Sequence, residues 1–146
     1  MENQPKDFIS LHNHTYFSLT KALSKPTDLF NKVKSLGQSG VAITDSATLA
    51  AAWDSLKASK ETGVKLIIGC EFNFVEDLTD EKARMRHVIL LAKNHQGYKN
   101  LLKAHKLAND NNLEIFKKLY PRINWQILQD HSEGLICLTG GGSGII

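Results

Sequence analysis

Short apolar segments alternate with segments of helical periodicity along most of this 146-residue chain, and this alternation restricts the fold more than any other feature. Residues 40–44 (GVAIT) and 64–68 (VKLII) are apolar at almost every position, so both faces of each predicted strand would be buried. Strands of this kind, separated by helices, are typical of a parallel sheet covered by helices. The sequence therefore predicts an α/β fold in one domain of ordinary size.

Five strands and four helices follow from the pattern. The strands are expected at residues 7–11, 40–44, 64–68, 87–92 and 135–139, with 72–75 extending the third and offering the fourth a pairing partner. The helices are expected at residues 26–37, about 48–62, about 96–109, and just after Asn124. Pro26 suits the first helical position and glycine suits the residue beyond the last turn, as at Gly37 and Gly63. Residues 76–86 are expected to form a charged loop, and residues 109–120 a polar surface helix or loop.

Each predicted helix carries apolar side chains at helical spacing, and this spacing indicates the face that turns toward the sheet. The inward set comprises Leu29, Phe30, Val33 and Leu36, then Leu49, Ala52, Trp53 and Leu56, then Tyr98, Leu101, Leu102 and His105, and finally Trp125 and Leu128. These side chains are the predicted helical half of the core.

A glycine-rich segment, Gly140 to Gly144 (GGGSG), follows the last predicted strand. It is interpreted as a structural turn, as an engineered linker, or as a phosphate-binding turn. It lacks the lysine and the spacing of a P-loop, which disfavours the last of these. A strand–helix repeat should continue with another helix at this point, so we expect the chain to be a fragment of a larger protein.

Composition excludes little. The formal net charge of +3 permits contact with nucleic acid without arguing for it. No apolar run approaches membrane-spanning length, so no membrane partner is expected. Cys70 and Cys137 both adjoin apolar runs, which predicts two buried free thiols and a reducing cytoplasmic location. Two isolated cysteines do not form a zinc site.

Two histidines, His12 and His14, flank one residue at the end of the first predicted strand. Alternate side chains of a strand point to the same face, so the two imidazoles would lie side by side. Such a pair is half of a transition-metal site. The same spacing also occurs by chance at strand ends and in exposed loops, so the pair alone does not establish metal binding.

Further polar residues follow the next two predicted strands. Asp45 and Ser46 follow residues 40–44, and Glu71 follows residues 64–68. Functional residues of α/β folds gather at the carboxyl ends of strands, so these side chains should converge on the histidines. Asp45 is equally well explained as a helix N-terminal cap or a turn residue. Glu71 could be a surface carboxylate, although its apolar neighbours disfavour this.

The remaining histidines are less informative. His87 begins the fourth predicted strand and would complete a ligand set if that strand folds toward the same edge. His95, His105 and His131 lie in helical or loop surroundings and are interpreted as surface or helix histidines.

At these residues the chain resembles a known family. The segments concerned are FISLHNHTYFSL (8–19), GVAITDSATLAAAW (40–53), GVKLIIGCEF (63–72), HVILLAKNHQGYKNLLK (87–103) and SEGLICLTGG (132–141). In order and spacing they are similar to the N-terminal PHP (polymerase and histidinol phosphatase) domain of the bacterial DNA polymerase III alpha subunit. The last two segments resemble the polymerase branch in particular.

The resemblance implies a distorted (β/α) barrel, incomplete in this chain, with residues 1–146 forming its N-terminal part. Family members with an intact site hold up to three metal ions at the carboxyl ends of the strands and hydrolyse phosphate esters. By position, the resemblance implies that His12, His14, Glu71 and His87 are metal ligands. They would be vestigial here, because other ligands of the family are missing.

Two positions depart from the family pattern. Lys21 stands where an acidic ligand is expected, and Ser46 stands where a histidine is expected. An ammonium group repels a metal ion, and a serine hydroxyl is a weak neutral ligand. The last ligand motif of the family would lie beyond residue 146. We therefore expect no cofactor in this fragment, other than one weakly bound zinc or manganese ion.

Two functions remain open at this point. The first is a non-catalytic module of a replicative polymerase, which supports the rest of the alpha subunit, docks a proofreading exonuclease subunit and meets DNA through the full-length protein. The second is an active metal-dependent phosphoesterase, either a 3'-5' exonuclease or a small-substrate phosphatase. Lys21 and Ser46 count against the second.

Overall fold

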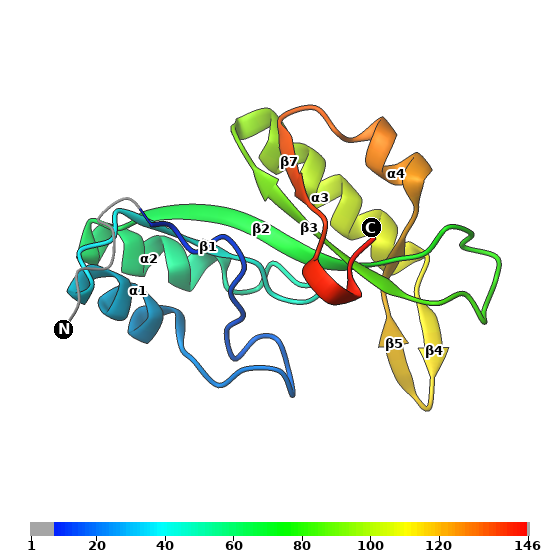
Figure 1. Cartoon of the computed structure of the whole chain (residues 1–146), viewed down its shortest axis with the longest axis horizontal. Coiled ribbons are helices and arrows are strands. Elements are labelled where there is room, and N and C mark those ends of the chain that lie inside the picture. Colours follow the sequence, from blue (N-terminus) through cyan, green and yellow to red (C-terminus); the bar gives the residue numbers. More distant parts are fainter. Residues whose placement is uncertain (1–7, 146) are drawn as a thin grey trace.

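The structure, a computed structural model, describes residues 8–145 (Figure 1). Asp7, the first residue of the first predicted strand, lies outside the described residues. The elements in chain order are α1 (Pro26–Ser35), β1 (Gly40–Ile43), α2 (Ala52–Thr62), β2 (Lys65–Phe74), β3 (Arg86–Ala92), α3 (His95–Asp110), β4 (Leu113–Ile115), β5 (Lys118–Tyr120), β6 (Arg122–Ile123), α4 (Trp125–Asp130), β7 (Leu135–Leu138) and a 3₁₀ turn (Gly141–Ser143).

The main sheet has the order β1-β2-β3-β7, with β6 paired to the end of β2. The expectation of a parallel sheet is only partly right. Strand β1 runs parallel to the first half of β2, and β6 runs parallel to its end, but β3 and β7 are antiparallel to their neighbours. No helix connects β2 to β3, and a strand that returns without a crossover helix must pair antiparallel.

The long strand β2 contains most of two apolar segments of the sequence, residues 64–68 and 72–75, in one continuous strand. Residues 72–75 were expected to extend the strand of residues 64–68, and β2 indeed runs through to Phe74. Its second half pairs with β3, with Phe72 opposite Val88, which confirms the predicted partner. Glu71 therefore lies in the interior of a strand, where the backbone of its neighbours fixes its direction.

The predicted first strand is not a regular strand within the described residues. The extended segment after Phe8 makes one parallel bridge, between Ser10 and Val41, beside β1. The N–H of Ala42 donates to the Ser10 carbonyl at 2.9 Å, and the N–H of Thr44 donates to the Asn13 carbonyl at 2.9 Å. These two hydrogen bonds hold the segment beside β1 as far as Asn13, directly before His14.

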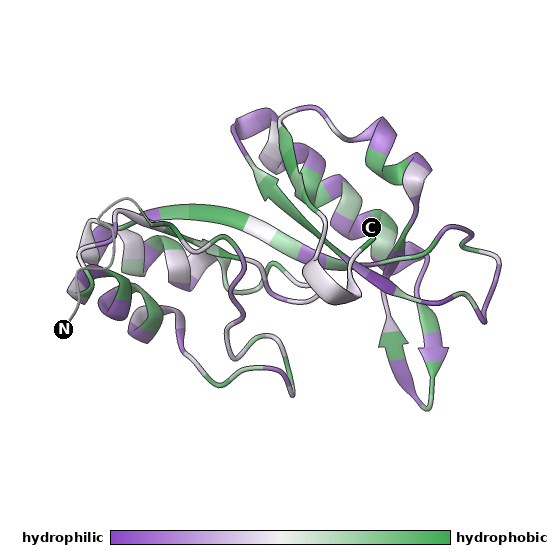
Figure 2. Cartoon of the chain, viewed as in Figure 1, coloured by the Kyte–Doolittle hydropathy of each residue, from purple (hydrophilic) through white to green (hydrophobic). Residues whose placement is uncertain are grey.

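The core divides along β2. Near its start, α1 packs on β1 and α2 packs on α1 and β2, in a cluster that includes Phe30, Val41 and Ala58. Beyond its middle, α3 packs on β2 and β3 through a second cluster that includes Phe72 and Leu101. Figure 2 shows the hydrophobic residues that run along β2 and β3, the two strands covered by these helices. The strand ends that carry polar residues lie between the two clusters.

Helix α2 faces the core differently from the prediction. It begins at Ala52 rather than near residue 48, and its buried positions are Ala51, Ser55 and Ala58. Small side chains let α2 approach α1 closely, which turns Trp53 outward with 66 % of its surface exposed. Leu56 is also exposed, so the predicted buried stripe of this helix is wrong.

Three further side chains of the predicted core are also exposed. Leu36 and Leu102 lie at the surface, while Val33 and Leu101 beside them are buried. Trp125 is half exposed, with its ring edge-on to Phe74 at 4.9 Å between centroids. The predicted capping role of the residue before α4 is confirmed, because the Asn124 side chain accepts the N–H of Ile127.

Residues 109–120 were expected to form a surface helix or loop, but only 109–110 are helical, as the end of α3, and 113–120 form two strands. Strands β4 and β5 make a hairpin whose two turn residues, Phe116 and Lys117, have φ values of 49° and 63°. Such turns usually carry Asn-Gly or Asp-Gly, so the ordinary sequence signal of a hairpin is absent at Phe116 and Lys117. Cys137 is exposed, which corrects the expectation of two buried thiols, whereas Cys70 is buried as predicted.

The glycine-rich segment folds as a turn. Gly140 adopts a left-handed conformation with φ of 83°, and Gly144 forms a bridge with His87 at the start of β3. A side chain at Gly144 would meet the carbonyl oxygen of Thr139 at 1.7 Å, so the close packing requires glycine. This favours the interpretation as a structural turn. Among the described residues, no helix combines the length and the apolar character needed to cross a membrane.

Candidate metal centre

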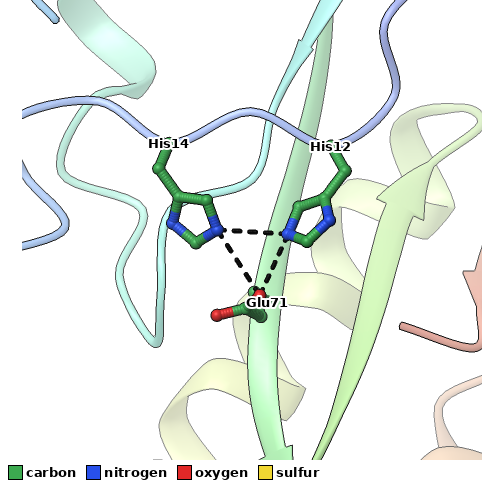
Figure 3. Close-up of side chains that lie close together, drawn as sticks. All are labelled: His12, His14 and Glu71. Carbon is green, nitrogen blue, oxygen red and sulfur yellow. Dashed lines mark hydrogen bonds and ion pairs between the residues drawn. The ribbon is translucent and has the colours of Figure 1, made fainter. Parts of the chain in front are cut away.

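Three backbone segments bring polar side chains to one place. The extended segment beside β1 supplies His12 and His14, and Glu71 comes from the middle of β2 (Figure 3). Ser46, just beyond β1, forms a parallel bridge with Glu71, so the end of β1 is held against β2 at this point. The predicted convergence of these strand ends is therefore found in the structure.

His12, His14 and Glu71 form a compact triad of potential ligand atoms. The Nε2 atoms of the two histidines lie 3.1 Å apart, and the Glu71 Oε2 atom lies 2.9 Å from that of His12 and 3.4 Å from that of His14. Ligands at about 2.0–2.1 Å from a tetrahedral zinc ion stand roughly 3.3 Å from one another. The triad therefore fits three ligand positions of one ion.

The tautomer of His14 follows from its neighbours. The Ser18 hydroxyl donates to Asp45 Oδ1 at 2.5 Å, so its oxygen can only accept from His14 Nδ1, 2.9 Å away. The hydrogen of neutral His14 must then be on Nδ1, which leaves the lone pair of Nε2 directed at the triad. A hydrogen bond made by the other ring nitrogen in this way orients the histidine ligands of metal sites.

Asp45 is neither a helix cap nor a member of the triad. It is 1 % exposed, and its carboxylate accepts the N–H of Thr15 at 2.6 Å and the hydroxyl of Thr15 at 2.7 Å, besides that of Ser18. It thus fixes the loop that follows the two histidines. Sequence reasoning missed Thr15 and Ser18, because hydroxyl residues in a loop carry no pattern of their own.

The second oxygen of Glu71 contacts a different set of groups. The Lys21 ammonium donates to Oε1 at 2.8 Å and to the Ser46 hydroxyl at 2.7 Å, and the Ser46 hydroxyl donates to Oε1 at 2.6 Å. Burial would raise the pKa of Glu71, but the hydrogen bonds from Lys21 and Ser46 and the positive charge of Lys21 outweigh it and hold the pKa well below its ordinary range. Glu71 is therefore an anion at neutral pH.

His87 lies beside Glu71 but outside the triad. Its Nδ1 atom is 3.4 Å from Oε1 of Glu71, yet it is buried and has no hydrogen-bond partner. His105 contacts the Ala47 carbonyl at 3.2 Å, and neither it nor His95 nor His131 joins the triad.

A pocket of about 580 Å³ opens beside the centre. It is lined by Lys21, Ser46 and His87 from beside the centre and by Lys118 and Tyr120 of the β4–β5 hairpin. Its lining contains no acidic side chain. The pocket next to the centre therefore carries two lysine charges and no carboxylate.

The chain is similar to known proteins over almost its whole length. The family model of the PHP domain matches residues 10–146. The chain is 39 % identical over 95 % of its length to the DNA polymerase III subunit alpha of Borreliella burgdorferi, 38 % over 92 % to that of Helicobacter pylori, and 35 % over 96 % to that of Aquifex aeolicus. It spans only 12 %, 11 % and 13 % of these relatives, respectively.

Two solved structures share the fold. One is a protein from Bifidobacterium adolescentis assigned as a metal-dependent phosphoesterase, with a TM-score of 0.55 and 26 % identity, covering 73 % of this chain and 34 % of that one. The other is an amidohydrolase from Chromobacterium violaceum, with a TM-score of 0.52 and 18 % identity, covering 70 % and 33 %. At 18 % identity, the second shows similarity of fold alone.

Proposed function

The chain belongs to the PHP domain family, and on this premise we propose that it is the PHP module of a DNA polymerase III alpha subunit and does not itself hydrolyse phosphate esters. The observation that carries the first part is the 35–39 % identity to alpha subunits, which extends over at least 92 % of the chain in the three relatives compared. We propose in addition that the whole protein, of which this chain is the PHP module, polymerises DNA, contacts DNA and lies in the cytoplasm.

We also propose where this chain lies within the whole protein. Residues 1–146 correspond to the N-terminal part of the PHP domain, and the rest of the barrel and the polymerase domains would lie outside them. The small share of each relative that the chain covers supports this. Sequencing the gene around this segment tests it. A reading frame many times longer, with polymerase domains downstream, is expected, and a stop codon close to residue 146 would contradict it.

The absence of hydrolysis is proposed from the size of the ligand set. Hydrolysis of a phosphate ester by this family needs ions that activate water and neutralise the phosphate. Among the described residues, only His12, His14 and Glu71 come together as a ligand group, enough for one weakly held zinc or manganese ion. Such an ion would act as a Lewis acid. Ser18 and Asp45 would orient His14 toward it.

One observation favours the alternative, a metal-dependent phosphoesterase. The triad has near-tetrahedral spacing, and the chain shares its fold with a protein assigned to that activity at 26 % identity. The Lys21 ammonium on Glu71 weighs against it, because a fixed positive charge disfavours further metal ions in the same place.

Cleavage of single-stranded DNA and of a generic phosphate monoester, each with added manganese or zinc, distinguishes the two functions. We expect no turnover above background. Replacing Lys21 and Ser46 together, by Lys21→Asp and Ser46→His, should not create activity in residues 1–146, because the last ligand motif that the family resemblance implies lies outside them. Metal-stimulated turnover that disappears in Glu71→Ala would establish the phosphoesterase instead.

A module without hydrolytic activity would serve the polymerase as a structural element and as a docking surface for the proofreading exonuclease subunit. The test uses the full-length alpha subunit with and without residues 8–145. Loss of co-purifying exonuclease subunit on deletion, with polymerase activity on short primers retained, supports docking. Equal recovery of the exonuclease subunit from both proteins would contradict it.

A further inference from the structure

We propose that the Lys21 ammonium is the resident cation of this centre and replaces a second metal ion on Glu71. The inference rests on the proposed function, because it explains how a PHP module can keep its fold without a full set of metals. It concerns Lys21 and Ser46, the two positions at which the sequence departs from the pattern that the family resemblance implies. Three observations support it.

The first observation is that the two carboxylate oxygens of Glu71 contact different groups. Oε2 faces the histidine nitrogens of the triad, and Oε1 faces Lys21 and Ser46. In two-metal sites, paired ions a few ångströms apart act together, and a carboxylate can link such a pair by giving one oxygen to each. Glu71 has this arrangement, with an ammonium group where the second ion would be.

The second observation is how firmly the ammonium is held. Lys21 Nζ donates to Glu71 Oε1 and to the Ser46 hydroxyl, at 2.8 and 2.7 Å. The loop that carries it is tightly turned. The Lys21 N–H donates to the Ser18 carbonyl at 2.9 Å, and Thr20 has a φ of 69°, which is unusual for a β-branched residue. Such strain persists only where surrounding contacts over-determine the conformation.

The third observation is the unpartnered nitrogen of His87. Its Nδ1 atom is buried, has no hydrogen-bond partner and lies 3.4 Å from the same Oε1 atom. Buried polar atoms are rarely left unsatisfied, and each case calls for an explanation. An ion bound to Oε1 could also be bound by this nitrogen in the tautomer that leaves it unprotonated, whereas the Lys21 ammonium donates to Glu71 and Ser46 and makes no hydrogen bond to it.

The charge of Lys21 also acts on the triad. Lys21 Nζ binds the carboxylate whose other oxygen faces the triad, and a unit charge about 5 Å from a divalent ion weakens its binding about tenfold or more even at the dielectric constant of water. Removing the charge should therefore tighten binding at the triad. It should also free Oε1 of Glu71 and Nδ1 of His87 for a second ion.

Cobalt(II) titration of the whole chain, followed by visible absorption and by equilibrium dialysis, tests the proposal without reference to activity. Lys21→Met should bind cobalt at least about tenfold more tightly than the wild type. Adding Ser46→His should raise the number of ions from one to two per chain. The matched control is Lys118→Met, which removes the same charge from the same pocket but does not contact Glu71.

Equal cobalt affinity in the wild type, Lys21→Met and Lys118→Met would overturn the proposal. A Lys21→Met protein that folds only when cobalt is present would support it, as judged by circular dichroism. A Lys21→Met protein that stays unfolded with and without cobalt would overturn it, because the metal should be able to replace the ammonium. Hydrolysis by the wild type, in contrast, would refute the proposed function and leave these affinities to be measured separately.

Discussion

Replacing Asp45 by alanine should destabilise the chain more than almost any other polar substitution. The Asp45 carboxylate is buried and accepts three hydrogen bonds from the loop of residues 15–18. In Asp45→Ala three buried donors lose their acceptor, namely the N–H and hydroxyl of Thr15 and the hydroxyl of Ser18. Each buried donor left without a partner costs about 1–3 kcal/mol. The sum is about 3–9 kcal/mol, and because the two hydroxyls can rotate we expect a loss near the lower end, about 4 kcal/mol in the free energy of unfolding.

Urea unfolding followed by the fluorescence of Trp53 and Trp125 measures this loss. The matched control is Asp110→Ala, which breaks an exposed ion pair with Lys106 and should cost no more than about 0.5 kcal/mol. If Asp45→Ala is unfolded without urea, Thr15→Val removes one of the three hydrogen bonds and should cost about 1.5–3 kcal/mol. A loss below about 1 kcal/mol in Asp45→Ala would refute the reasoning.

Three further predictions concern other parts of the molecule. Cys137 is exposed, whereas burial strongly raises the pKa of Cys70, so a thiol reagent should modify one cysteine quickly and the second only after unfolding; rapid reaction of both in the folded protein would contradict this. Gly97→Ala should destabilise α3 in thermal unfolding, because the added carbon would lie 1.8 Å from a backbone oxygen, while Gly142→Ala has open space and should be neutral; equal melting temperatures would refute the steric argument. The edge strand β7 exposes unpaired backbone groups beside Ile136, so sedimentation at high concentration should show self-association, and a sharp monomer would count against it.

The sequence predicted the elements that local signals specify. Pro26 begins α1, Gly63 ends α2 in the left-handed conformation, and Asn124 caps α4, each through a contact that involves only near neighbours. Strand β2 and its pairing with β3 were also correctly predicted, because both are long apolar runs.

The failures have a common cause in tertiary packing. The spacing of Leu49, Trp53 and Leu56 is ideal for a buried helical face, but α2 turns its small residues toward α1 instead. The β4–β5 hairpin has Phe116 and Lys117 in its turn, and neither residue is a usual turn former. Which face of a helix is buried depends on its neighbours, and a single sequence does not contain that information.

Part of the candidate centre could be predicted and part could not. The positions of His12, His14 and Glu71 after predicted strands indicated that they would meet, and they do. The buried network of Thr15, Ser18 and Asp45 could not be predicted, because it depends on a loop crossing over the end of β1. The contact between Lys21 and Glu71 was likewise hidden, since fifty residues separate them.

The metal content of the wild-type chain tests the central claim most directly. After exhaustive dialysis against metal-free buffer following incubation with zinc or manganese, elemental analysis gives the number of ions per chain. A PHP module whose second cation position is filled by Lys21 should retain at most one ion, held by His12, His14 and Glu71. Retention of two or three ions per chain would contradict this account of the centre.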